Sequence, residues 1–265
     1  MSTPLIHTVT GQVMPVNAFI VETKNAAIVV DSTLTVSDSR LVKTRLEALN
    51  KPLAAVLITH AHPDHYAGLA QFTKDSTPII ALKEVNEVIR QDDAMKNEIV
   101  APMMGGEWPT VRPFPNQTLQ DEERISFDGV SFKIMNIGVA ESPANSIWHL
   151  EGSSAYFVGD LVYNKMHGYF ADGYHHEWLT ALDVWAKALP EDAVLYQGHG
   201  DTPVLKAQLD WQRAYIERFI DAVKRASGEN LEQQVTKDMK SFLPNDDLLF
   251  LMQLSVAPAK EQLGG

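Results

Sequence analysis

The chain has 265 residues, of which 45% are hydrophobic and 21% are charged, the proportions of an ordinary globular protein. It contains no cysteine, which excludes disulfide bonds, thiolate metal ligands and a cysteine nucleophile. Its formal net charge of −12 opposes binding to nucleic-acid phosphates. No apolar run reaches the roughly 18 residues that a membrane span needs.

Nothing in the sequence marks a linker or a low-complexity segment, so we expect residues 1–265 to form a single domain. The first residues have neither the basic nor the apolar region of a secretory signal, which favours a cytoplasmic protein. We expect a small-molecule substrate as the partner and no nucleic acid or membrane. A homodimer remains an alternative to a monomer, and the apolar run 248–252 would then either close the core or form the dimer contact.

The first fifty residues alternate strand and helix patterns. β-Branched and aromatic residues predict strands over 13–22 and 26–30, with a turn between them. Residues 36–49 repeat apolar side chains at helical spacing. The uninterrupted apolar run 54–58 is typical of a fully buried strand. The segment that follows it should therefore emerge at the end of a sheet.

That segment, His60-Ala61-His62-Pro63-Asp64-His65, is the most informative stretch of the chain. Neutral imidazole and carboxylate are the usual donors to a divalent metal such as zinc. Alternate positions of an extended chain point the same way, so His60 and His62 can bind one ion. Asp64 and His65 follow after a turn and can bind a second. The alternative is a polar helix start with scattered histidines.

This segment resembles the signature of the metallo-β-lactamase fold superfamily. The resemblance implies a four-layer αββα sandwich, an α/β fold with mixed sheets and helices outside. It places the metals at one edge, between the two sheets. It also implies further ligands much later in the sequence.

The middle of the chain is less regular. We expect a short helix over 66–73, a strand over 78–81 and a charged helix to about residue 99. Prolines and glycines interrupt 100–118, so we expect a long loop there. Trp108 lies on it, and the loop is either a connection plugged into the body or a flap that brings Trp108 onto the substrate.

The second half alternates strands with helices, as expected for two sheets covered by helices. Asp128-Gly129 predicts a hairpin turn. The expected strands are 124–127, 130–136, 145–150, 154–158 and 193–197, and the expected helices are 177–189 and 203–226.

Two later ligands match the superfamily pattern. Asp160 ends the apolar strand Phe157-Val158-Gly159, which is similar to the position whose carboxylate bridges the two metals. His199 lies in a Gly-His-Gly turn after a buried strand, where the family places its last histidine, on the second metal. The alternative for Asp160 is an aspartate that caps the next turn.

The remaining ligand departs from the family pattern. Where the family has histidine in a Gly-His-Thr-Pro turn, the segment that ends in Ser142-Pro143 has Glu141. A carboxylate here would remove one unit of charge from the cluster and favour a harder metal. Two alternatives remain open: Glu141 is an ordinary loop residue, or His149 from the following strand supplies the ligand.

Tyr163, Asn164 and His167 follow Asp160 within one segment. Phenol, amide and imidazole groups at the end of a strand can donate to an oxyanion or contact a substrate. The alternative is that they are ordinary polar loop residues.

The resemblance and these residues together predict a dinuclear metal-dependent hydrolase of a small-molecule ester, lactone or lactam. A hydroxide between two divalent ions would be the nucleophile, and Asp64 would orient it and pass a proton to the leaving group. Zinc is favoured for both ions, with manganese or iron as alternatives. The alternative function is a non-haem iron oxidoreductase, similar to a sulfur dioxygenase, on the same fold.

Overall fold

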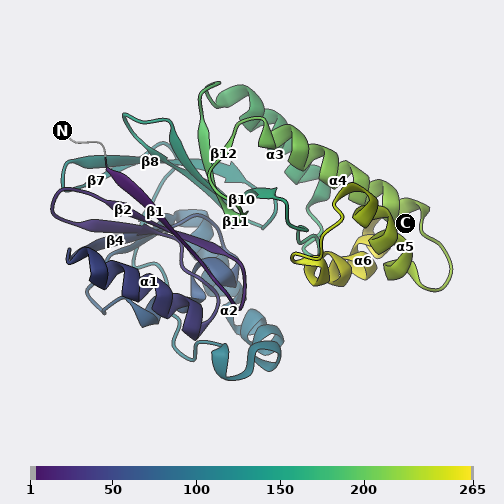
Figure 1. The fold of residues 1–265 in the computed structure, drawn as a ribbon, viewed down its shortest axis with the longest axis horizontal. Helices are drawn as coiled ribbons and strands as arrows, with labels where there is room; N and C mark the ends of the chain where they lie inside the picture. Colours follow the sequence, from purple (N-terminus) through teal and green to yellow (C-terminus); the bar gives the residue numbers. More distant parts are fainter. Residues whose placement is uncertain (1–3, 264–265) are drawn as a thin grey trace.

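The computed structural model describes residues 4–263. Within this range the chain forms two six-stranded sheets that lie against each other, with helices on the outer faces (Figure 1). This arrangement confirms the predicted αββα sandwich. No helix among the described residues combines the length and the apolar character that crossing a membrane requires.

The first sheet has its strands in chain order, with the first three antiparallel and the next three parallel to β3. The strands are β1 Leu5–Thr10, β2 Asn17–Glu22, β3 Ala27–Val30, β4 Leu53–Ile58, β5 Ile79–Leu82 and β6 Gln117–Leu119. Parallel strands are usually covered on both faces, so they are apolar throughout. This explains the apolar run 54–58, which forms β4 between two parallel neighbours. The metal motif follows this strand.

Two helices cover the first sheet, α1 (Val36–Leu49) and α2 (Lys83–Met104), and short 3₁₀ turns lie at Pro63–His65, Ala67–Gln71 and Gly105–Glu107. The predicted helix 36–49 is confirmed. Its first turn begins at Thr35, whose hydroxyl accepts a hydrogen bond from the Asp38 N–H, and it ends at Asn50 in the left-handed conformation. Gly68 lies against α1, where a Cβ would come 1.7 Å from the Ser39 Oγ.

The second sheet has the order β12-β11-β10-β9-β8-β7 and is antiparallel except for the pair β10 and β11. The strands are β7 Arg124–Phe127, β8 Val130–Gly138, β9 Asn145–Leu150, β10 Ala155–Asn164, β11 Val194–Gly200 and β12 Val204–Leu205. The predicted hairpin joins β7 and β8. The strand expected over 154–158 continues to Asn164, because an irregularity after Phe157 and Gly159 lets β10 stay paired with β11.

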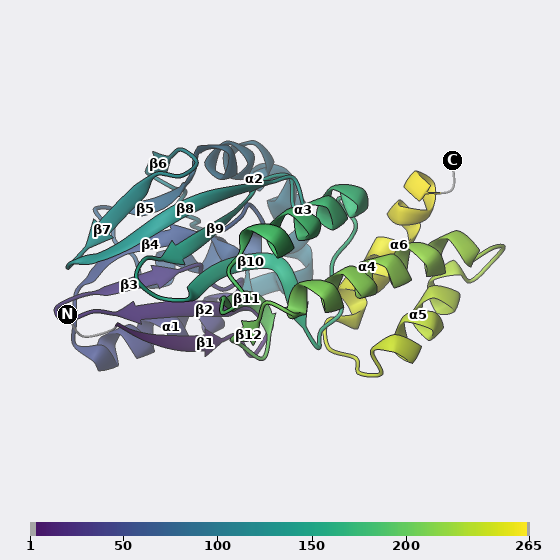
Figure 2. The same cartoon turned by 90° about the horizontal axis from the view of Figure 1, so that it is seen from above.

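Four helices follow in the second half: α3 His175–Ala188, α4 Gln208–Arg225, α5 Leu231–Phe242 and α6 Leu249–Leu263. Seen from above, α4, α5 and α6 extend beyond the sheets at one end of the molecule (Figure 2). The helix expected from residue 203 begins only at Gln208, because Val204 and Leu205 pair with β11 as β12.

The prediction of a loop over 100–118 is wrong at both ends. α2 continues through Pro102 to Met104, and residues 117–119 form β6. Val100, Ala101 and Met104 pack against the hydrophobic core, and this packing outweighs the hydrogen bond that proline removes from the helix. The irregular segment is therefore confined to residues 108–116.

Candidate metal centre

The seven predicted metal ligands come from four places in the two sheets. His60 follows β4, and His62, Asp64 and His65 lie in and next to the 3₁₀ turn after it. Glu141 lies in the connection between β8 and β9. Asp160 and His199 lie in β10 and β11, which are paired in parallel. All seven therefore meet where these strands approach one another.

The structure brings the seven together as two groups. The first donor group is His60, His62 and Glu141, and the second donor group is Asp64, His65, Asp160 and His199. Within each group, one donor atom from every residue lies within 4.8 Å of the others. This is the arrangement expected of two neighbouring metal sites. The assignment of these residues as metal ligands remains a prediction.

In the first donor group, the nitrogens of both histidines face one carboxylate oxygen. The Oε2 of Glu141 lies 2.8 Å from the His62 Nδ1 and 3.8 Å from the His60 Nε2. Glu141 is buried, and apart from its close contact with His62 its Oε2 makes no well-aligned hydrogen bond. Glu141 thus lies inside the cluster and is no ordinary loop residue. His149 lies elsewhere, stacked on Tyr156 with its Nε2 at the Ser153 carbonyl.

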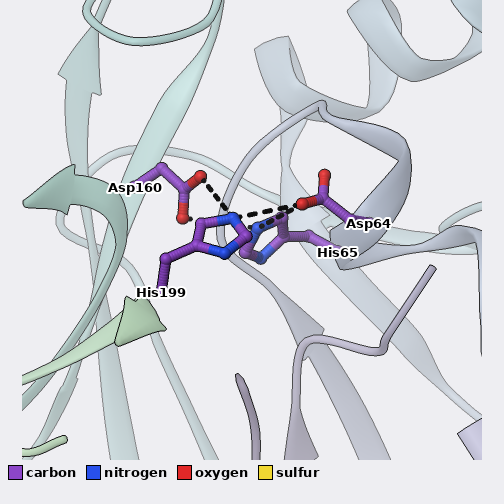
Figure 3. Close-up of side chains that lie close together, drawn as sticks. All are labelled: Asp64, His65, Asp160 and His199. Atoms are coloured by element: carbon purple, nitrogen blue, oxygen red, sulfur yellow. Dashed lines mark ion pairs between the residues drawn. The ribbon is translucent and has the colours of Figure 1, made fainter. Parts of the chain in front are cut away.

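In the second donor group, two histidines face two carboxylates (Figure 3). The His199 Nε2 lies 3.2 Å from an oxygen of Asp64 and 3.2 Å from the Oδ2 of Asp160. The His65 Nε2 lies 3.4 Å from the other Asp160 oxygen and 3.7 Å from Asp64. The Asp160 Oδ2 also lies 4.0 Å from the His60 Nε2. Asp160 therefore faces both donor groups.

Each of three histidines has its Nδ1 held by the protein, which leaves Nε2 to face the cluster. The Nδ1 of His60 lies 3.0 Å from the Thr59 hydroxyl. The Nδ1 of His65 lies 2.9 Å from an Asp31 oxygen, and the Nδ1 of His199 lies 2.7 Å from the Pro15 carbonyl oxygen. Such bonds fix the ring orientation and the tautomer of metal-ligating histidines. The donor set is thus pre-arranged for an ion.

The buried atoms that face the cluster lack hydrogen-bond partners. Among the described residues these include the Nε2 atoms of His60 and His65, the Glu141 Oε2 and the Asp160 Oδ1. Buried polar atoms are nearly always paired, so four unpaired atoms converging on one place call for a common partner. Nitrogen and oxygen donors of this kind suit zinc, manganese or iron. The residues present therefore fit two divalent cations.

Protonation of the cluster is set by its burial and its carboxylates. Burial holds the pKa of His60 well below its ordinary value, so this imidazole is neutral. Burial also opposes charge on His62 and His199, but the neighbouring carboxylates outweigh it and raise both pKa values to about 10. Burial raises the pKa of Glu141 to about 7. Metal must displace these protons, so we expect metal affinity to rise with pH.

Two supporting elements were missed by the sequence analysis. Asp31 accepts hydrogen bonds from the Thr59 N–H, the Thr59 hydroxyl and the His65 ring, and it adopts a positive φ of 61° to do so. The sequence offered one sign of this role, because Asp31 is an acidic residue directly after the buried strand β3. Asp38 accepts bonds from three backbone N–H groups of residues 12–14, which holds the Pro15 carbonyl against His199.

Asp172 is a third residue that the sequence analysis missed, and it positions His62. Its Oδ2 lies 2.9 Å from the His62 Nε2, which leaves Nδ1 as the nitrogen that faces Glu141. Asp172 lies in the turn before α3, and nothing in the local sequence distinguishes it from any other turn aspartate. Tyr169 and Lys96 face its other oxygen, at 3.3 and 3.7 Å.

We expect Asp172→Asn to weaken metal binding without removing a ligand. An asparagine can still accept from His62, but it no longer supplies the charge that makes the ring a stronger donor. Loss of such outer contacts typically costs about 10–100-fold in metal affinity. Competition titration with a chromophoric chelator measures the effect. Asp183→Asn, on the exposed face of α3, is the matched control, and equal affinities for the two variants would contradict the assignment.

Glu141 itself can be tested by two substitutions. We expect Glu141→Ala to lose one of two bound metals, because the first donor group would retain only two donors. Glu141→His should retain both metals but shift the preference from manganese or iron towards zinc, since it exchanges a hard donor for a softer one. Metal analysis of purified protein measures both results. Unchanged stoichiometry and affinity in Glu141→Ala would contradict the assignment.

A cavity of about 290 Å³ opens above the two donor groups. Its floor includes His62, Asp64, Glu141, Asp160 and His199, and α2 and α6 form its walls. The run 248–252 contributes to two surfaces: Leu248 and Met252 are buried in the core, and Phe250 and Leu251 line this cavity. The position of the cavity makes it the candidate ligand pocket of the cluster.

Of the four residues expected to contact substrate, only Tyr163 lines this cavity. Trp108 is buried against α2, with its Nε1 donating to Asn97, because the segment that carries it packs down instead of forming a flap. The His167 ring bonds the Tyr215 hydroxyl, and the Asn164 amide bonds the Asp201 carbonyl. These bonds hold both side chains away from the cavity, which neither residue lines.

Comparison with known proteins agrees with this architecture. The family model of the Metallo-beta-lactamase superfamily matches residues 11–199. A hydroxyacylglutathione hydrolase of Aeromonas hydrophila is 25% identical over 186 residues, which covers 68% of this chain and 59% of that protein. A probable hydroxyacylglutathione hydrolase of Schizosaccharomyces pombe is 25% identical over 179 residues, covering 67% and 60%. The chain thus spans about three fifths of the length of these curated relatives.

Solved structures show the same fold. A metallo-beta-lactamase family protein from Thermus thermophilus has a TM-score of 0.68 at 17% identity, covering 98% of this chain and 94% of that chain. A metallo-beta-lactamase from Pontibacter korlensis has a TM-score of 0.64 at 19% identity, covering 82% and 96%. The family match spans most of the chain and includes all seven predicted ligands, and the chain belongs to the Metallo-beta-lactamase superfamily.

Proposed function

We propose that the protein is a dinuclear metal-dependent hydrolase of an uncharged ester, thioester, lactone or lactam. The observation that supports this most is the convergence of unpaired buried donor atoms from two groups on the floor of one cavity. Membership of the superfamily and the relatives named hydroxyacylglutathione hydrolase agree with the proposed hydrolysis. When bound, two divalent cations would polarise the carbonyl group and make water acidic.

The chain's own groups can orient the attacking water. Asp64 lines the cavity, and although burial opposes its charge, His65 and His199 hold its pKa well below the ordinary value. Asp64 is therefore an ionised carboxylate that can orient the attacking water by accepting a hydrogen bond from it. Tyr163 has a raised pKa and remains a neutral donor, with its hydroxyl 2.7 Å from Asp160.

The test combines metal analysis with a hydrolysis panel. We expect about two zinc, manganese or iron ions per chain, and acid release from at least one uncharged ester, thioester, lactone or lactam that stops when a chelator removes the metal. Binding of two metals without hydrolysis of any of the four classes would contradict the proposed activity. Full activity in metal-free protein would contradict the proposed mechanism.

A second candidate is a non-haem iron oxidoreductase on the same scaffold. The first donor group supports it, because two histidines and one carboxylate are the ligand set of many non-haem iron sites. Iron in freshly purified protein, together with oxygen uptake on a thiol substrate, would favour this function over hydrolysis.

A further inference from the structure

The cavity above the donor groups has two different halves. Its floor carries the acidic and imidazole side chains of the cluster, and its walls are almost entirely apolar. Met14 and Leu34 line one side, and α2 and α6 supply most of the remainder. A ligand that reaches the cluster must therefore place its remaining atoms against hydrocarbon.

The two wall helices present matched apolar faces at the mouth. Ile99 and Met103 are one turn apart on α2, and Phe250 and Leu254 are one turn apart on α6. All four line the cavity and are 40–55% exposed. Residues at this spacing share one face of a helix. Exposed apolar side chains gathered around a pocket mark a binding surface for an apolar group.

The charges around the cavity disfavour an anionic ligand. Lys96 is the only lysine or arginine among the described residues that line it, and its ammonium group lies 3.7 Å from Asp172. Asp172 also bonds His62, so the charge of Lys96 is already paired with a carboxylate that supports the cluster. The two cations proposed on the floor would neutralise Asp64, Glu141 and Asp160, so the charge that a ligand's remaining atoms meet is that of the walls, in a chain of net charge −12. A substrate with several carboxylates away from its scissile group would lack a cationic partner on these walls.

We propose that the substrate is an uncharged ester or lactone with an apolar chain of several carbons, which lies between α2 and α6 while its carbonyl group faces the cluster. The inference rests on the proposed hydrolysis and names its substrate class. In the reaction, the oxygen of water bonds to the acyl carbon, the bond between that carbon and the alkoxy oxygen breaks, and the alkoxy oxygen takes a proton. The glutathione portion of a glutathione thioester, with its charged carboxylates, does not suit these walls.

Three uncharged esters test the proposal by proton release at constant pH: methyl acetate, methyl hexanoate and hexyl acetate. Each buried methylene is expected to raise kcat/KM about fourfold, so at least one of the two long-chain esters, each with a six-carbon chain, should exceed methyl acetate by more than about 30-fold. These two esters report on which side of the bond the chain binds. Equal kcat/KM for all three esters, or faster hydrolysis of a glutathione thioester than of methyl hexanoate, would overturn the proposal.

Substitutions at the mouth localise the effect. Met103→Gln and Leu254→Gln place polar groups at positions that are 55% and 53% exposed, so the fold should tolerate them. We expect each to lower at least fivefold the ratio of kcat/KM for the preferred long-chain ester to kcat/KM for methyl acetate. Val184→Gln is the control, because Val184 is a 53% exposed apolar residue on α3 that does not line this cavity. Equal effects of all three substitutions would overturn the proposal.

Binding without turnover separates this inference from the proposed function. Hexanamide is an uncharged ligand with the same chain, and calorimetry should show it binding at least tenfold more tightly than acetamide, with a negative heat-capacity change. If hexanamide binds in this way but no ester is hydrolysed, the pocket assignment stands and the hydrolase fails. If esters are hydrolysed without chain preference and hexanamide does not bind, the pocket assignment fails. Dimer dissociation by Met103→Gln without a change in ester preference would assign the apolar mouth to a second copy of the chain.

Discussion

Gly198→Ala should abolish metal binding and activity although it adds only one methyl group. Gly198 precedes His199 in β11, and a Cβ built on it would lie 2.1 Å from the Asp160 Oδ1 and 2.6 Å from the His65 Cε1. Neither neighbour can move freely, since both are buried in the second donor group. Displacement of catalytic groups by about 1 Å can cost about 100-fold in rate, so we expect at least that loss in kcat/KM.

Gly106→Ala is the matched control for this substitution. A Cβ at Gly106 would meet no atom within 4 Å, and its backbone does not have a positive φ. We expect Gly106→Ala to retain both metals and wild-type thermal stability. Metal analysis and circular dichroism of the two variants make the comparison. If Gly198→Ala bound two metals with wild-type affinity, the close packing of β11 against Asp160 and His65 would be wrong.

Much of the centre was predictable because a metal site needs particular side chains at strand ends. The motif from His60 to His65 follows a run of apolar residues, and the end of a buried strand is readable from such a run. Gly198 and Gly200 frame His199, and the structure explains both: a Cβ at Gly200 would come 1.9 Å from the Asn164 carbonyl oxygen. Local chemistry therefore predicted the residues from His60 to His65, the resemblance to the superfamily predicted Glu141, Asp160 and His199, and the fold brings these residues together.

The supporting residues were not predictable, because their partners are distant in sequence. Asp172 lies 110 positions from His62, and the Pro15 carbonyl lies 184 positions from His199. Neither a turn aspartate nor a backbone carbonyl has a local signature of such a role. Only the tertiary fold brings these groups to the rings that they orient.

Element boundaries failed where tertiary packing outweighed local propensity. Pro102 predicts the end of a helix, but α2 continues to Met104 because its last turn packs on the core. Of the two readings of the segment around Trp108, the structure fits the connection packed into the body: Arg112 stacks on the Trp108 ring and Asn97 accepts from its Nε1. The last turn of α2, which was expected to be loop, lines the cavity.

Asp160→Asn should have the largest effect of any substitution that preserves side-chain shape. Asp160 is the residue whose oxygens face both donor groups, towards His65 on one side and towards His199 and His60 on the other. An amide nitrogen is a donor only and cannot ligate a metal, so asparagine would leave one of these sides without a ligand. The substitution also removes one of the three carboxylates of the two donor groups.

We expect Asp160→Asn to bind at most one metal per chain and to lose more activity than the 10–100-fold typical of an outer contact such as Asp172. The rise in Tm on adding zinc, which reports metal binding to the folded state, should shrink accordingly. A variant that kept two metals and differed from wild type only in rate would show that Asp160 acts on the substrate and does not join the two sites.

Asp93→Asn provides the control for removing a buried aspartate in general. Asp93 pairs with Arg112 at 2.7 Å and accepts from the Tyr66 hydroxyl, away from the cluster. Breaking a buried pair destabilises the fold because a charge is left without its partner. Asp93→Asn should therefore lower Tm yet retain two metals, whereas Asp160→Asn should lose metal. Asp93→Asn tests whether metal binding needs an intact core, and Asp160→Asn tests whether it needs a ligand of the metal centre. Of the two aspartates, Asp160 is the one that faces unpaired donor atoms.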